Sequence, residues 1–94
     1  MKIKIALRAA KQMEDIYAYY VLNESINRAD KVINSFFDAF EACAQNPYIF
    51  PKAISTSDSH HIRKGVIHST YTFRYHIYKH HIRIISIIHG KRNI

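Results

Sequence analysis

The chain has 94 residues with a formal net charge of +7, and 48% of its residues are hydrophobic. This length fits one domain with a core of its own, and the one cysteine, Cys43, excludes an intramolecular disulfide. The sequence has no segment typical of a signal peptide and no apolar run near the roughly 18 residues of a membrane span. We therefore expect residues 1–94 to form a single domain of a cytoplasmic protein with no membrane contact.

The first elements are a short strand and a helix. Residues 2–7 alternate lysine with apolar residues, which predicts a strand whose inward side includes Ile3, Ile5 and Leu7. From about Ala9 the apolar residues recur at helical spacing, so a first helix is predicted to run to about Leu22.

A second helix follows, with Ser25 as a candidate N-cap. It is predicted to end near Gln45, because Pro47 disfavours a helical conformation at Asn46. Its apolar stripe predicts a face that packs on a sheet. The stripe consists of Ala29, Ile33, Phe36, Phe40 and Cys43.

Three strands are predicted after a loop over residues 46–60. In the first, from residue 62 to 68, Gly65 predicts a bulge or a close approach of backbone. The second spans residues 70–78, and the third, residues 82–89, is rich enough in isoleucine to be central. The fold class is therefore α+β, in the order β-α-α-β-β-β, with an N-terminal strand, a helical hairpin and a three-stranded antiparallel sheet.

Strand alternation predicts a basic patch on the open face of this sheet. Tyr71, Phe73, Tyr75 and Ile77 are predicted to face the helices, so that Arg74 and His76 lie on the opposite face. We expect Arg63, at the start of the preceding strand, and Arg92, just after the last one, to approach the same face.

The distribution of charge supports such a patch. All seven acidic residues precede residue 59, whereas the last 36 residues contain seven Lys or Arg and all seven histidines. This half of the fold should present a positive surface to a nucleic acid, an acidic protein, or both.

The residue types limit the chemistry of the patch. The doublets His60–His61 and His80–His81 point to opposite faces in extended chain and lack Cys, Asp or Glu partners, so no metal site or cofactor is predicted. The remaining cations can bind phosphate through arginine forks, or can assist metal-free RNA cleavage with a histidine as proton shuttle. A solvated basic face without a ligand is the alternative.

The sequence also resembles the RelE/ParE superfamily of bacterial toxins from type II toxin–antitoxin modules. The predicted order of elements carries this resemblance, together with the segments "AQNPYIFP", "HIRKGVI", "YTFRYHIY" and "IRIISIIHGKRNI". It implies a cognate antitoxin that wraps the toxin in a hetero-oligomer. We expect part of the antitoxin-binding surface to come from Ile33, Phe36, Phe37 and Phe40.

The resemblance further implies one of two activities. RelE-like members are ribosome-dependent mRNA endonucleases, whereas ParE-like members inhibit DNA gyrase. Thr72 stands where RelE-like enzymes carry a catalytic arginine, and the C-terminal tyrosine of those enzymes is missing. The ending "IIHGKRNI" resembles the His-x-x-Arg ending of ParE-like proteins, which favours a gyrase inhibitor that is not itself an enzyme. The target contacts are then predicted to be Arg63, Arg74, His76, His89, Lys91 and Arg92.

Two alternatives remain open. A metal-independent endoribonuclease acting on the ribosome and its mRNA would use Arg63, Arg74, His89 and Arg92 as catalytic residues. A non-toxic basic binding module is the second alternative.

Overall fold

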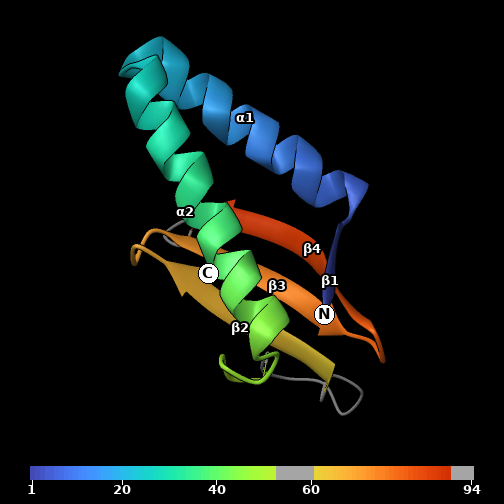
Figure 1. The fold of residues 1–94 in the computed structure, drawn as a ribbon. Coiled ribbons are helices and arrows are strands. Elements are labelled where there is room, and N and C mark those ends of the chain that lie inside the picture. Colours follow the sequence, from blue (N-terminus) through green and yellow to red (C-terminus); the bar gives the residue numbers. More distant parts are fainter. Residues whose placement is uncertain (53–60, 90–94) are drawn as a thin grey trace.

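The computed structural model describes residues 1–52 and 61–89, in which two helices cover one face of a four-stranded sheet (Figure 1). This arrangement confirms the α+β class and the predicted order of elements. In chain order the elements are β1 (Lys2–Ile5), α1 (Leu7–Asn23), α2 (Ile26–Gln45), β2 (Ile62–Ile67), β3 (Tyr71–Ile77) and β4 (His81–His89).

The sheet has the order β1-β4-β3-β2. β2, β3 and β4 form the predicted antiparallel meander, and β4 is central, as its isoleucine content indicates. β1 adds a fourth strand that runs parallel to β4, with Ile3 opposite Ile82. This pairing is possible because the helical hairpin separates β1 from the later strands and brings the chain back in the same direction.

The junction between β1 and α1 corrects one prediction. Leu7 is the first residue of α1 and is 79% exposed, so it is not an inward-facing strand residue. The strand ends earlier because Ala6 is already the N-cap of α1: its N–H donates to the Ile84 carbonyl at 2.9 Å, and its own carbonyl accepts from the Ala10 N–H. No side chain caps this helix.

The second helix has the predicted bounds. The Ser25 hydroxyl accepts a hydrogen bond from the Arg28 N–H at 3.0 Å, which confirms the cap, and the helix ends at Gln45. Four of the five stripe residues are fully buried, whereas Ile33 is only partly buried and Val32 lies in the core beside it.

The core lies between α2 and the sheet and consists largely of aromatic rings. Phe36 packs edge-on against Tyr71, with 5.2 Å between ring centroids, and Phe40 packs against Phe73 at 5.3 Å. Gly65 lies directly opposite Phe73 in continuous register. Its role is therefore the close approach, and the irregularity in the sheet lies instead between Arg74 and Tyr75 on β3.

Neither helix in the described part of the chain combines the length and apolar character that crossing a bilayer requires.

Candidate target-binding surface

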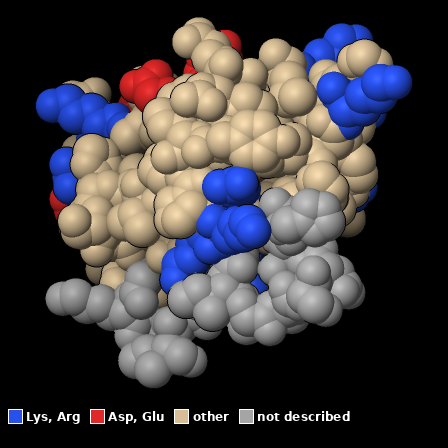
Figure 2. All heavy atoms as spheres, turned by 90° about the horizontal axis from the view of Figure 1, so that it is seen from below, with Lys and Arg blue, Asp and Glu red and all other residues tan. Residues whose placement is uncertain are grey.

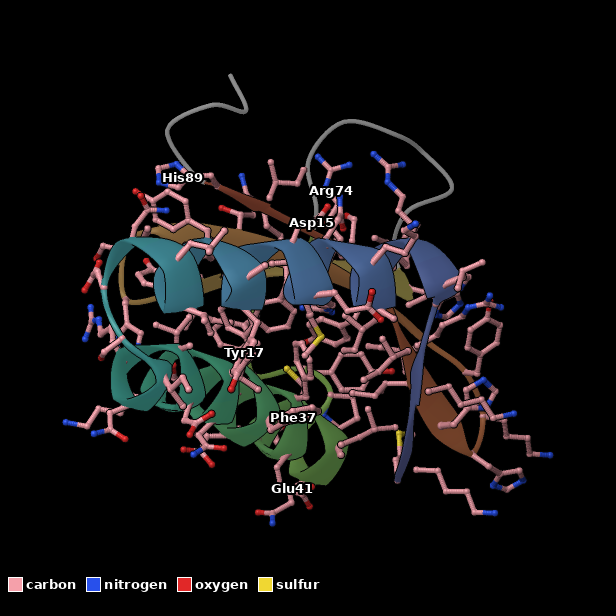
Figure 3. The ribbon with its side chains drawn as sticks, turned by 90° about the horizontal axis from the view of Figure 1, so that it is seen from above. Asp15, Tyr17, Phe37, Glu41, Arg74 and His89 are labelled. Atoms are coloured by element: carbon pink, nitrogen blue, oxygen red, sulfur yellow. The ribbon has the colours of Figure 1, made fainter. Side chains whose placement is uncertain are left out.

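The sheet face that points away from the helices carries cations from all its strands. Residues opposite each other in a sheet project to the same side, so the register shows which side chains share this face. Lys4 lies opposite Arg83, Arg83 opposite His76, and Lys64 opposite Arg74. Figure 3 shows Arg74 on the side of the sheet away from α1 and α2. The predicted placement of Arg74 and His76 is thus confirmed.

Acidic side chains are absent from the described strands. Six of the seven acids lie on the helices or in the turn between them, and the seventh, Asp58, lies outside the described residues. Within the described ranges, the one ion pair joins Arg28 to Glu24 at 3.6 Å, beside the helical turn. Figure 2, which views the molecule from below, shows basic side chains in the middle of the view, whereas the acidic side chains coloured there lie at its upper and left margins. Such a surface attracts anionic partners.

Arg63 does not share this face, which corrects the prediction. It lies opposite Tyr75, whose side chain is fully buried on the helical side. One of its terminal nitrogens donates to the Phe50 carbonyl at 3.0 Å, and its guanidinium carbon lies 4.8 Å from the centre of the Tyr48 ring. The strand register places Lys64 beside Arg74, and this turns its neighbour Arg63 inward. Through these two contacts, Arg63 stabilises the segment that follows α2.

His89 also lies away from the open face. It is opposite the buried Tyr71, with 5.5 Å between the ring centroids, and is half-buried at the end of β4. It lines a groove of about 570 Å³ between α1 and β4. The predicted contacts Lys91 and Arg92 follow it in sequence and lie outside the described residues. The other residues of this groove are Gln12, Asp15, Ile16, Tyr19, Tyr20, Glu24, Tyr71, Ile87 and Ile88.

A second groove, of about 520 Å³, lies between α2 and the turn that joins β2 to β3. Tyr20 and Tyr71 line both grooves, and their hydroxyls are 3.1 Å apart. The second groove is basic at one end, because Arg28, Lys31 and His68 line it. Its remaining residues are Val32, Asn34, Ser35, Asp38 and Thr70.

The predicted antitoxin-binding residues differ in their access to a partner. Phe36 and Phe40 are 0% exposed, so they stabilise the core and leave no surface for a partner. Ile33 is partly buried, and Phe37 is 46% exposed. Figure 3 shows Glu41 on the outer side of α2, one helical turn after Phe37. Of this set, Phe37 is the residue that a partner can reach most easily.

Two features of the described residues bear on their chemistry. They contain no cluster of three or more His, Cys, Asp or Glu side chains that could hold a metal ion. Burial raises the pKa of the Cys43 thiol to about 11, which keeps it protonated and unreactive. Burial also raises the pKa of Tyr75, whose hydroxyl donates to the Pro47 carbonyl at 2.6 Å.

Several residues of the open face were not predicted. Lys64, Arg83 and Lys4 belong to it, and so does the ring of His81. Alternation within each strand predicts which of its own residues point to the same side. The partner of β1 and the register of β2 were needed to place residues from different strands on one face.

Comparison with known proteins supports a common fold. The family model described as "ParE toxin of type II toxin-antitoxin system, parDE" matches residues 3–94. A solved structure from P. aeruginosa, described as a chromosomal ParDE TA system, superposes with a TM-score of 0.77 at 18% identity, covering 95% of each chain. A YoeB/ParE toxin from Agrobacterium tumefaciens superposes with a TM-score of 0.65 at 12% identity, covering 95% of this chain and 98% of that one. A comparison with curated protein sequences gives no significant match.

Proposed function

The chain belongs to the ParE toxins of type II toxin–antitoxin systems, and we propose that it inhibits DNA gyrase and is neutralised by a cognate antitoxin. The observation that carries the first part is the open face of the sheet, on which every charged side chain of the described strands is a cation. Lys64, Arg74 and Arg83 come from three adjacent strands, and no described strand carries an acid. A gyrase–DNA complex is a target of the opposite charge.

The target contacts under this proposal come from two regions. Arg74 and His76 act from the open face, on rigid strands. His89 acts from the end of β4, and Lys91 and Arg92 follow it in sequence. All of them serve as binding groups rather than as catalysts.

The positions of the described residues favour this function over RNA cleavage. A metal-free ribonuclease needs its cations and proton shuttle around one phosphate. Arg63 faces the helices, Arg74 projects from the opposite face, and His89 lies at the far end of β4. These three side chains therefore do not surround a common point.

A gyrase assay with the purified protein tests the proposal. Supercoiling should be inhibited and cleaved DNA should accumulate, and the Arg74→Glu variant should lose most of this effect. Lys11→Glu makes the same charge reversal on the exposed side of α1 and should keep it. Cuts in ribosome-bound mRNA, with gyrase unaffected, would overturn the proposal.

We further propose that the antitoxin covers the outer side of α2, including Phe37 and part of Ile33. The adjoining groove is basic at its Arg28 and Lys31 end, which suits an acidic segment of the antitoxin. The similar solved structure from P. aeruginosa is described as a ParDE toxin–antitoxin system, which supports a partner of this kind.

Co-expression with the protein encoded by the adjacent gene tests this surface. Phe37→Ala should weaken the complex by about tenfold, because truncating a central aromatic contact removes roughly 1–2 kcal/mol. Tyr19→Ala removes a similarly exposed ring from α1 and should leave the complex intact. Equal binding by both variants would place the antitoxin elsewhere.

A further inference from the structure

Four aromatic rings form a stack at the end of the open face that is furthest from His89, with an angle of 31° between the planes of His76 and Tyr78. The Tyr78 ring lies between His76, at 4.3 Å between centroids, and His81, at 4.5 Å. His61 continues the stack from the start of β2, with 6.3 Å between its ring and that of His76 and an angle of 17° between their planes. These four residues are called the ring stack below.

Strand geometry explains why these rings meet. His76 and Tyr78 are two residues apart, so they project to the same side of the sheet. The Tyr78 N–H donates to the His81 carbonyl at 2.8 Å across the β3–β4 turn, which brings the two rings face to face. Tyr78 is 39% exposed, so the stack reaches the surface and is not part of the core.

The cations around the ring stack lie opposite other cations. Lys4 faces Arg83 across the β1–β4 pair. Further along the same face, Lys64 lies opposite Arg74. Like charges in opposed positions destabilise a sheet, and no carboxylate among the described strand residues relieves them. An anionic partner bound over this face would offset that repulsion, because it would attract the cations of both strands.

We propose that the ring stack and the cations beside it form a binding site for a nucleic-acid strand with unpaired bases. Such a strand supplies both complements: phosphates for Lys4, Arg83 and Lys64, and planar bases that extend the stack beyond His81 or cover its exposed edges. An acidic peptide would match the charges but would bring no rings to the stack. This proposal does not depend on gyrase inhibition, since the isolated chain would bind the strand without gyrase.

Fluorescence anisotropy of the purified full chain with labelled oligothymidylate, oligouridylate and duplex DNA tests this site. Either unpaired strand should bind more tightly than the duplex. Tyr78→Leu removes the central ring that holds His76 and His81 in the stack, and it should weaken binding of the unpaired strand by about fivefold or more, because losing the stacking contact of one base corresponds to ~1–3 kcal/mol. Tyr19→Leu, an exposed ring on α1, is the matched control and should bind like the parent.

A second pair of variants keeps the test valid if Tyr78→Leu folds poorly. Arg83→Gln should reduce the slope of log affinity against log salt concentration by about 0.7, as expected for one lost phosphate contact to a single strand. Lys11→Gln on α1 should leave the slope unchanged. Preference for the duplex, or no effect of Tyr78→Leu and Arg83→Gln, would overturn the site. Because no gyrase is present, this result is independent of the gyrase assay.

Discussion

At the scale of single residues, Gly65 allows two aromatic rings to lie against the backbone of β2. A methyl group at this position would lie 2.5 Å from two ring carbons of Phe73 and 3.0 Å from a ring carbon of Phe50. Phe73 is fully buried, so its ring cannot move aside freely.

The Gly65→Ala substitution should therefore destabilise the fold. We expect the free energy of unfolding to fall by about 1–3 kcal/mol, the usual effect of overpacking a filled core. Urea denaturation followed by circular dichroism measures it. Val66→Ala, at the exposed neighbouring position, should change the midpoint little, and an unchanged midpoint in Gly65→Ala would contradict the packing described here.

His76 gives the fold a dependence on pH. Its pKa is lowered from the ordinary 6.5, first by burial and then by repulsion from His61. Burial also lowers the pKa of His81, with further contributions from Lys4 and Arg83. The folded chain therefore binds these protons less readily than the unfolded chain does, and acidification favours unfolding.

We expect the free energy of unfolding to be highest above pH 6.5 and to decrease as the pH falls through 6.5 toward the lower pKa of the folded state. Urea titrations at pH 7.5 and 5.5 measure the difference, and His76→Gln should reduce it. His68→Asn, in the exposed β2–β3 turn, is the control and should keep the difference of the parent. A larger free energy of unfolding at pH 5.5 than at pH 7.5 would contradict the lowered pKa of His76.

At the scale of elements, the two helices begin in different ways. Ser25 caps α2 through its hydroxyl, whereas Ala6 gives α1 no side-chain cap. α2 also supplies six of the buried core residues, against two from α1. The start of α2 therefore matters more for the stability of the whole sheet–helix core.

Replacing the cap of α2 tests this assignment. Ser25→Ala should lower the free energy of unfolding by about 0.5–2 kcal/mol, because a helix N–H loses its acceptor. Ser35→Ala removes a hydroxyl that only donates to carbonyls within α2, and we expect a change of less than about 0.5 kcal/mol. Thermal melting of both variants measures the difference. Equal decreases in melting temperature would argue against Ser25 as the cap.

At the scale of the whole molecule, charge is divided between the two layers. The helical layer carries both acidic and basic residues. Apart from tyrosine, the ionisable residues of the described strands are all lysine, arginine or histidine. This separation accounts for the opposed cations of the open face, such as Lys64 and Arg74. Stability and target binding should therefore respond in opposite directions to a change of charge here.

Lys64→Glu tests this opposition. The variant should be more stable by about 0.2–1 kcal/mol, because a repulsive cross-strand pair becomes an attractive one. Its inhibition of gyrase should nevertheless fall, since an anion now stands on the target-binding face. Lys11→Glu has the same net charge and should retain inhibition. A Lys64→Glu variant that gained stability and kept full inhibition would separate this face from the function.

The sequence by itself determined the order of the elements, the Ser25 cap, the aromatic face of β3 and the one-sided distribution of charge. These follow from periodicity and local backbone chemistry, which act between residues close in the chain. The family resemblance, too, needed only the residues. Which cations share a face was decided by tertiary structure alone. Register is a long-range property, and a shift of one residue reverses every side chain, so that Arg63 faces the core while Lys64 joins Arg74. The parallel pairing of β1 with β4 likewise brought Lys4 to Arg83, across a distance in sequence that local patterns do not span.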